Sequence, residues 1–132
     1  MRFTPYLNFD GNAGEAMRFY QEIFGGDLEL SPFGESPMAD EVPADMKDRL
    51  MHAELRVGDQ VLMSSDAMPG QYGTPAGTYV TIALGDVAEA DRIFAALADG
   101  GVVQMPIQET FWAKRFGMLA DRYGTLWMVN CE

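Results

Sequence analysis

Two stretches of the sequence repeat one another: GNAGEAMRFYQEIFGG from Gly11 to Gly26 and GDVAEADRIFAALADGG from Gly85 to Gly101. Adding 74 to the first set of positions pairs Gly11 with Gly85, as it does Glu15 with Glu89 and Arg18 with Arg92. A chain of 132 residues has little room for accidental agreement of this extent. The repeat predicts one structural unit that occurs twice.

Each stretch has the pattern of an amphipathic helix. The apolar positions recur at spacings of three and four, which places them on one helical face. Asn12 and Asp86 are the predicted N-caps, with the glutamate three positions later closing a capping box, and each glycine pair is predicted to end its helix. The predicted core stripes are Ala13, Ala16, Met17, Tyr20, Ile23 and Phe24, and Val87, Ala90, Phe94 and Leu97.

Strand-like segments surround the two helices in the same order. One precedes each helix and three follow it, the later ones joined by tight turns such as Gly58-Asp59. The expected strands cover 3–9, 27–33, 51–57 and 60–65, and then 78–84, 102–108, 115–121 and 126–132. This predicts a βαβββ module over 1–65, a Gly- and Pro-rich linker over 66–77, and a second βαβββ module over 78–132, together one compact α+β domain.

Composition excludes several classes of function. Twenty acidic and nine basic residues give a net charge of −11, which opposes binding to nucleic acid or to an anionic membrane. No apolar run is long enough to span a membrane, and the first residues lack the apolar stretch of a signal peptide. The single cysteine, Cys131, forms no intrachain disulfide, so a cytoplasmic protein is expected.

The segment 35–48, ESPMADEVPADMKD, is acidic and interrupted by prolines. It predicts a surface loop. Solvation is the simpler interpretation of its charges, and a lid over a pocket is the alternative.

YLNFDGNAGEAMRFYQEIFGG, MHAELRVGDQVLMSSD and FWAKRFGMLADRYGTLWMVN together resemble the vicinal-oxygen-chelate superfamily, which includes glyoxalase I, bleomycin-resistance proteins and extradiol dioxygenases. More narrowly, they look like its phosphonate-operon PhnB-like branch, also called demethylubiquinone-methyltransferase-like. The resemblance implies that each module curls into half of an open barrel of mixed sheet, with its helix on the convex side. It also implies a homodimer.

In the metal enzymes of this superfamily, His, Glu or Gln ligands lie on the first and last strands of the modules. Carried over by the resemblance, those places fall on Tyr6 (or Pro5), Met63 (or Ser64), Thr81 (or Tyr79) and Met128. None of these is a usual ligand of a catalytic divalent ion. Thioethers suit Cu(I), but two methionines without a third soft partner favour apolar lining over metal. We therefore expect no cofactor and no metal site of the usual kind.

Strand alternation places His52, Glu54 and Arg56 on one face and Met51, Ala53, Leu55 and Val57 on the other. If the polar face lines a cavity, His52 with Glu54 is a candidate general acid or base. The alternative is a structural salt-bridge ladder at a sheet edge or dimer interface. The same two side chains are too few to hold a metal ion by themselves.

Aromatic residues are the other candidates for ligand contact. Phe111, Trp112 and Phe116 cluster near the seventh strand, and a site lined by them or by Tyr6 and Tyr79 could stack a flat or cationic ligand. Trp127 is expected to pack under a helix instead. Asp66 and Asp121, at strand ends, are expected to form local turns.

These observations predict a metal-independent small-molecule-binding protein, with Tyr6, Met63, Tyr79, Thr81, Trp112, Phe116 and Met128 as ligand contacts. The charge and the aromatic residues favour a neutral or cationic ligand. The first alternative is a lyase or isomerase that uses His52 with Glu54 on a small carbonyl or phosphonate-related metabolite. The second is an interaction module without a small ligand.

Overall fold

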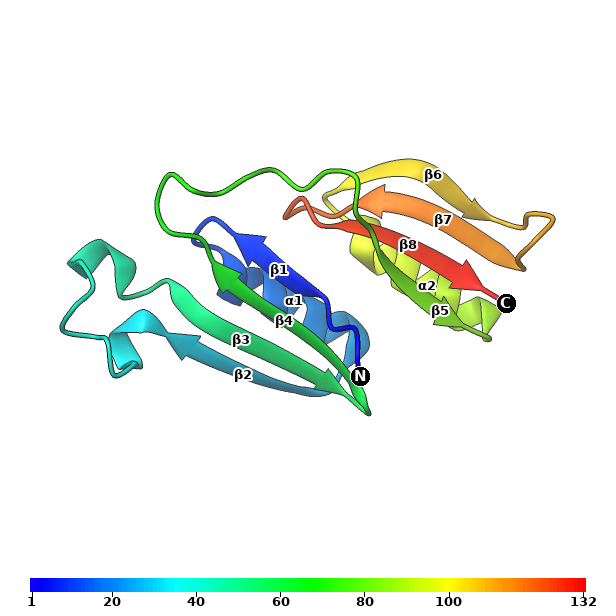
Figure 1. Cartoon of the computed structure of the whole chain (residues 1–132). Coiled ribbons are helices and arrows are strands. Elements are labelled where there is room, and N and C mark those ends of the chain that lie inside the picture. Colours follow the sequence, from blue (N-terminus) through cyan, green and yellow to red (C-terminus); the bar gives the residue numbers. More distant parts are fainter. The chain divides into compact units, whose positions relative to one another are not determined.

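The computed structural model describes all residues from 1 to 132, in two compact units, Met1–Gly73 and Thr74–Glu132. The order βαβββ predicted for both repeats is confirmed (Figure 1). The first unit contains β1 (Tyr6–Phe9), α1 (Ala13–Phe24), β2 (Asp27–Pro32), β3 (Leu50–Val57) and β4 (Gln60–Asp66), with short 3₁₀ turns at Phe33–Glu35 and Ala44–Met46. The second contains β5 (Val80–Leu84), α2 (Val87–Ala98), β6 (Val102–Gln108), β7 (Arg115–Ala120) and β8 (Leu126–Cys131).

Both units have the same sheet topology. The strand orders are β1-β4-β3-β2 and β5-β8-β7-β6, each with one parallel pair, β1 with β4 and β5 with β8, and otherwise antiparallel pairs. Each sheet is therefore mixed, and neither closes on itself. This confirms the α+β fold class. No helix in the structure has both the length and the apolar character needed to cross a membrane.

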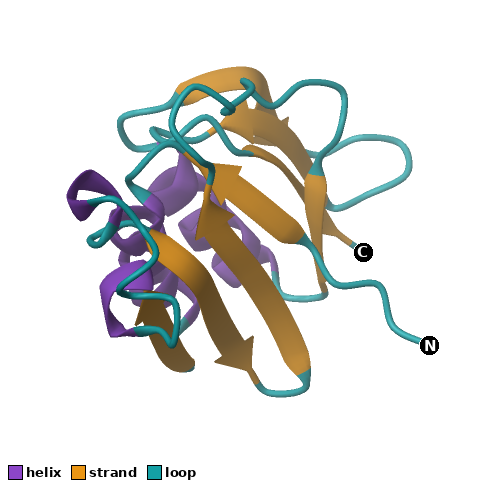
Figure 2. Ribbon diagram, turned by 60° about the vertical axis from the view of Figure 1, so that its left-hand side comes forward, coloured by secondary structure: helices purple, strands orange, loops and turns teal.

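Each helix packs on one face of its own sheet (Figure 2). The fully buried residues of α1 are those of its apolar stripe, and Ala53 and Leu55 of β3 are buried in the same unit. In the second unit Leu119, Trp127 and Val129 are buried with the stripe of α2. Of the predicted stripes, Phe24 and Val87 are only partly covered, and Ile93 is a core residue that the repeat comparison did not single out. Cys131 ends β8 as a buried free thiol.

The N-termini of the two helices are capped differently. Asp86 caps α2 as predicted, its carboxylate accepting a hydrogen bond from the amide of Ala88. Asn12 occupies the N-cap position of α1 as predicted, but its side chain makes no capping bond, so the predicted side-chain cap is wrong. The capping box predicted for Glu89 is not formed. Glu89 pairs with Arg92 instead, and the hydrogen bond from Arg92 lowers the pKa of the Glu89 carboxyl.

Glycine ends both helices, as predicted. Gly25 has φ +74° and donates its amide to the carbonyl of Gln21, and Gly100 has φ +77°. The second glycine of each pair lies against a strand: a Cβ on Gly26 would approach the Arg56 carbonyl oxygen to 2.1 Å. Helix and sheet are thus brought close together directly after each helix.

The acidic loop is held at both of its ends. The amides of Phe33 and Gly34 donate to the carbonyls of Arg49 and Lys47, and Met46 is buried, whereas Asp40 and Glu41 are exposed. At the N-terminus the first strand begins at Tyr6, not at the predicted residue 3, and Phe3 is exposed.

Candidate functional site

The face of each sheet opposite its helix carries the candidate residues. On the first sheet, the strand register places Tyr6 opposite Met63, Met63 opposite Glu54, and Glu54 opposite Glu29. Paired residues on neighbouring strands point to the same side of a sheet, so these four side chains form a row across β1, β4, β3 and β2. We call it the first row.

A chain of polar contacts runs along β3 beside the first row. The Tyr6 hydroxyl lies 3.2 Å from Nδ1 of His52, His52 Nε2 lies 4.0 Å from Glu54 Oε1, and Arg56 donates to Glu54 Oε2 at 2.7 Å. The predicted grouping of His52, Glu54 and Arg56 on one face is confirmed. Tyr6 is an additional member that reading along a single strand could not find, since it lies 46 positions from His52.

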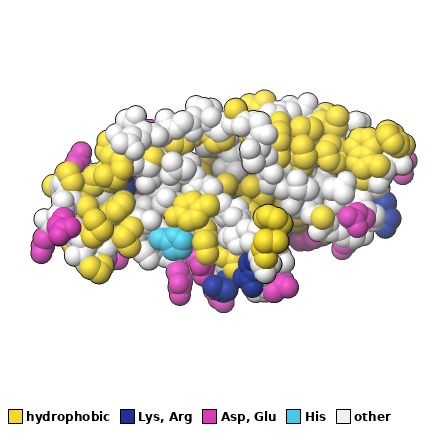
Figure 3. All heavy atoms as spheres, in the orientation of Figure 1, with side chains coloured by type: hydrophobic (Ala, Val, Ile, Leu, Met, Phe, Trp, Pro, Cys, Tyr) yellow, Lys and Arg dark blue, Asp and Glu magenta, His cyan; other side chains and the backbone are white.

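This contact chain engages both ring nitrogens of His52. In the tautomer that carries its proton on Nε2, Nδ1 of His52 accepts from the Tyr6 hydroxyl while Nε2–H faces Glu54. The His52 side chain is 37% exposed and that of Glu54 16%, so the imidazole is open to solvent while the carboxylate behind it is largely covered. Figure 3 shows the single histidine at the surface, beside hydrophobic side chains and above acidic ones.

The second sheet carries a corresponding row of different chemistry. Thr81 lies opposite Met128, Met128 opposite Met118, and Met118 opposite Met105. Where the first row has carboxylates on β3 and β2, this second row has thioethers on β7 and β6. The three methionines are partly exposed. Leu119, Trp127 and Val129 are buried beneath α2, so strand alternation places Met118 and Met128 on the opposite face.

Aromatic side chains extend the second sheet at the β6–β7 connection. Trp112 contacts Phe111 and Phe116 edge-on, with ring centroids 4.8 and 5.3 Å apart, and Phe111 is 97% exposed. Tyr79 donates its hydroxyl to Gln104 at 2.8 Å. Trp127, by contrast, is buried and donates its indole N–H to Asp121, in agreement with the prediction that it packs under the helix.

The positions carried over from the superfamily's metal enzymes form one pair of neighbours in each unit. In the first unit Tyr6 pairs with Met63, a phenol beside a thioether, and in the second unit Thr81 pairs with Met128, a hydroxyl beside a thioether. The alternative Ser64 is fully buried among the residues on the helix side, so it cannot contribute. Neither pair fits a catalytic divalent ion, which takes imidazole nitrogen or carboxylate oxygen. No three His, Cys, Asp or Glu side chains gather in a way that could hold one.

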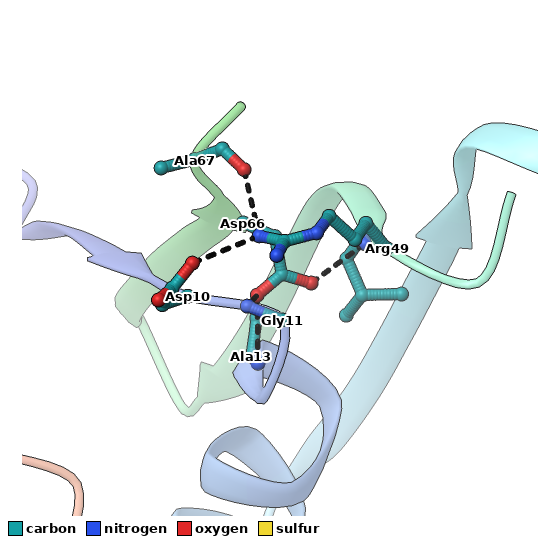
Figure 4. A network of polar contacts seen from close by, with 7 residues as sticks. Asp10, Gly11, Ala13, Arg49, Asp66 and Ala67 are labelled. Atoms are coloured by element: carbon teal, nitrogen blue, oxygen red, sulfur yellow. Dashed lines mark hydrogen bonds and ion pairs between the residues drawn. The ribbon is translucent and has the colours of Figure 1, made fainter. Parts of the chain in front are cut away.

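A polar network in the first unit escaped the sequence interpretation (Figure 4). The buried carboxylate of Asp66 accepts hydrogen bonds from the amides of Gly11 and Ala13, at the start of α1, and of Leu50, at the start of β3. Arg49 lies beside it and bonds Asp10 and the carbonyl of Ala67. The local turn predicted for Asp66 is therefore wrong.

Asp121 does form the local turn predicted for it. Its carboxylate accepts from the amides of Tyr123 and Thr125 as well as from Trp127. All three hydrogen bonds of the Asp66 carboxylate are made to backbone amides. Both carboxylates are thus engaged in supporting the fold, and we do not place them among the candidate catalytic groups.

Comparison with known proteins identifies the relatives of the chain. The sequence profile of the family described as 3-demethylubiquinone-9 3-methyltransferase matches residues 1–130. The protein YjdN of Escherichia coli K12 is 36% identical over 98% of this chain and 95% of its own length. The crystal structure of protein PA1353 from Pseudomonas aeruginosa is 49% identical, covers 100% of this chain and 98% of the other, and superposes with a TM-score of 0.92.

More distant structures share the fold. A PhnB protein from Bacillus cereus is 26% identical over the full length of both chains, with a TM-score of 0.81. A glyoxalase-related enzyme from Fulvimarina pelagi and the fosfomycin resistance protein FosX from Mesorhizobium loti align with all of this chain at TM-scores of 0.62 and 0.59, and at 17% and 13% identity. These two show the fold alone, which is that of the vicinal-oxygen-chelate superfamily.

Proposed function

The chain belongs to the 3-demethylubiquinone-9 3-methyltransferase family, and from the side chains on its open sheet faces we propose that it is a small-molecule-binding protein that works without a catalytic divalent ion. The observation that carries the proposal is the first row. It presents the exposed ring of Tyr6 and the thioether of Met63 next to the imidazole of His52, on a face that α1 leaves open.

The same face indicates the kind of ligand. The Tyr6 and His52 rings lie 5.8 Å apart at their centroids, which is direct ring contact, so together they offer one aromatic surface for a flat group. The adjacent carboxylate of Glu54 and the net charge of −11 favour a neutral or cationic compound over an anion. Within the second unit taken by itself, the proposed ligand contacts are Trp112, Phe116, Tyr79, Thr81 and Met128.

A direct test is a fragment screen by NMR chemical-shift perturbation with flat compounds of neutral, cationic and anionic charge. We expect neutral or cationic compounds to perturb the amides around Tyr6, and Tyr6→Ala to weaken that binding by about tenfold. Phe3→Ala is the matched control, because Phe3 is an exposed aromatic residue outside the row. Binding confined to anions, or binding unaffected by Tyr6→Ala, would contradict the proposal.

Independence from a divalent ion is tested separately, by elemental analysis of protein purified without chelator or affinity tag. We expect no near-stoichiometric divalent metal, in the wild type or in His52→Ala. A divalent metal held by the wild type and lost in the variant would overturn this part of the proposal.

The contact chain from Tyr6 to Arg56 supports a second function, proton transfer on a small carbonyl or phosphonate-related metabolite. The imidazole of His52 is the exchanging group in it, and Glu54, fixed by Arg56, orients the ring. If this activity exists, His52→Ala abolishes turnover and leaves ligand affinity within a few-fold of the wild type. Turnover that persists in His52→Ala would contradict a role of His52 in proton transfer.

The methyl transfer in the family description is not part of the proposal. Gly25-Gly26 and Gly100-Gly101 end helices, whereas the Gly-rich turns that bind nucleotide-like cofactors open them. A homodimer and a cytoplasmic location complete the proposal, and analytical ultracentrifugation tests the first of these.

A further inference from the structure

Three methionine side chains of the second row lie side by side across β6, β7 and β8. Met118 is the central one, because β7 lies between β8 and β6 in the sheet, and it is opposite both Met128 and Met105. All three are partly exposed, and Met105 pairs with Met118 between two irregularities of the β6–β7 register. Two methionines alone would make a weak metal site. The strand register supplies the third soft donor.

The spacing suits convergence of the three sulfur atoms. Directly paired residues of neighbouring strands have Cβ atoms about 4.5–5.5 Å apart. A methionine side chain has three rotatable bonds and ends in a polarizable thioether. The outer side chains can therefore lean toward Met118 and bring the three sulfurs around one point above β7.

The edge strand that carries Met105 is also tied down. Gln104, the residue before it, accepts a hydrogen bond from the hydroxyl of Tyr79, which directly precedes β5. Because β5 and β6 are the two opposite edges of this sheet, the bond links its edges to each other. This bond anchors the residue next to Met105 on the edge strand.

From this arrangement we propose that the second row binds one Cu(I) ion through the thioethers of Met105, Met118 and Met128. Thioether sulfur selects Cu(I), and the row contains no carboxylate or imidazole that would favour a hard divalent ion. The first row is a natural comparison, since it has one thioether, Met63, and two carboxylates at the matching places. The site shares Met128 with the ligand contacts proposed for the second unit and contains no residue of the first row.

The test is an anaerobic titration of the full chain against Cu(I) held by the chromophoric chelator bicinchoninate. We expect the wild type to withdraw one Cu(I) per chain, and Met118→Leu to lower the affinity by about tenfold or more. Leucine conserves the side-chain volume, so the variant keeps its fold, which circular dichroism checks. Met63→Leu, the matched change in the first row, is expected to leave the affinity unchanged.

Two further measurements exclude other ligands. Cys131→Ala is expected to bind Cu(I) as the wild type does, because the thiol is buried on the helix side of the sheet. X-ray absorption at the copper edge is expected to show sulfur neighbours only. Failure of the wild type to withdraw Cu(I), unchanged affinity in folded Met118→Leu, loss of binding in Cys131→Ala, or nitrogen neighbours at the metal would each overturn the proposal.

Discussion

In the first unit the helix is capped by a carboxylate from a strand 53 residues further along the chain, whereas in the second the residue directly before the helix caps it. The two units share their strand order and their helix ends, yet Asp66 and Asp86 perform the same task from unrelated places in the sequence. In both repeats the first amides of the helix require a hydrogen-bond acceptor, but the residue that supplies this acceptor differs between the repeats.

The largest effect is expected from Asp66→Ala. Removing the carboxylate leaves the amides of Gly11, Ala13 and Leu50 without their acceptor, two of these hydrogen bonds being buried, so the free energy of unfolding is expected to fall by about 3–5 kcal/mol. Urea unfolding measures the loss, and hydrogen exchange of the three amides localises it. A loss as small as that of Asp86→Ala would mean that the two caps are equivalent after all.

The glycine pairs test what the two units have in common. Gly26→Ala combines a positive φ with a Cβ 2.1 Å from a backbone oxygen, and we expect it to destabilise the protein by about 2–4 kcal/mol. Gly101→Ala meets the Ala120 carbonyl oxygen at 2.3 Å and is expected to act similarly. Gly25→Ala, with the same sign of φ but open space around it, is the control and is expected to cost about 1 kcal/mol.

Asp86→Ala is expected to have a smaller effect, about 1 kcal/mol, because the lost bond is a single exposed cap to the Ala88 amide. Asp86→Asn keeps a capping oxygen and should recover most of the loss. Thermal unfolding of the three proteins provides the comparison. Equal destabilisation by Ala and Asn would show that the charge, not the hydrogen bond, caps α2.

The smallest effect is expected from Arg92→Ala on the surface of α2. The hydrogen bond from Arg92 holds the pKa of Glu89 below its ordinary value of 4.5. Because the folded pKa is lower than the unfolded one, the pair stabilises the fold above pH 4.5, and this contribution is lost as the pH falls through the folded value. We expect a barely measurable change at pH 7 and none at low pH, by urea unfolding. A change that persists in acid would assign another role to Arg92.

Features that depend on local sequence could be predicted, and contacts that depend on strand pairing could not. The helix ends and the common face of His52, Glu54 and Arg56 were predictable, because they depend on local spacing and on glycine's access to positive φ. The contact of Tyr6 with His52 was not, because it requires the pairing of β1 with β4 and of β4 with β3.

The second row illustrates the same limit. Met128 was found by resemblance, but Met118 and Met105 became its neighbours only through the register of two antiparallel pairs, one of which contains irregularities beside Met105. Asp66 was assigned to a local turn for a related reason: an aspartate at a strand end looks the same in sequence whether its partners are near or distant.

The buried position of Cys131 makes it a probe of local opening in the second unit. It is the only thiol of the chain, and it is fully buried where β8 ends. A thiol reagent can reach it only when the second unit opens, so the rate of its alkylation counts those openings with no engineered label. Local opening of the second unit can thus be followed by mass spectrometry, because the first unit contains no cysteine that reacts with the reagent.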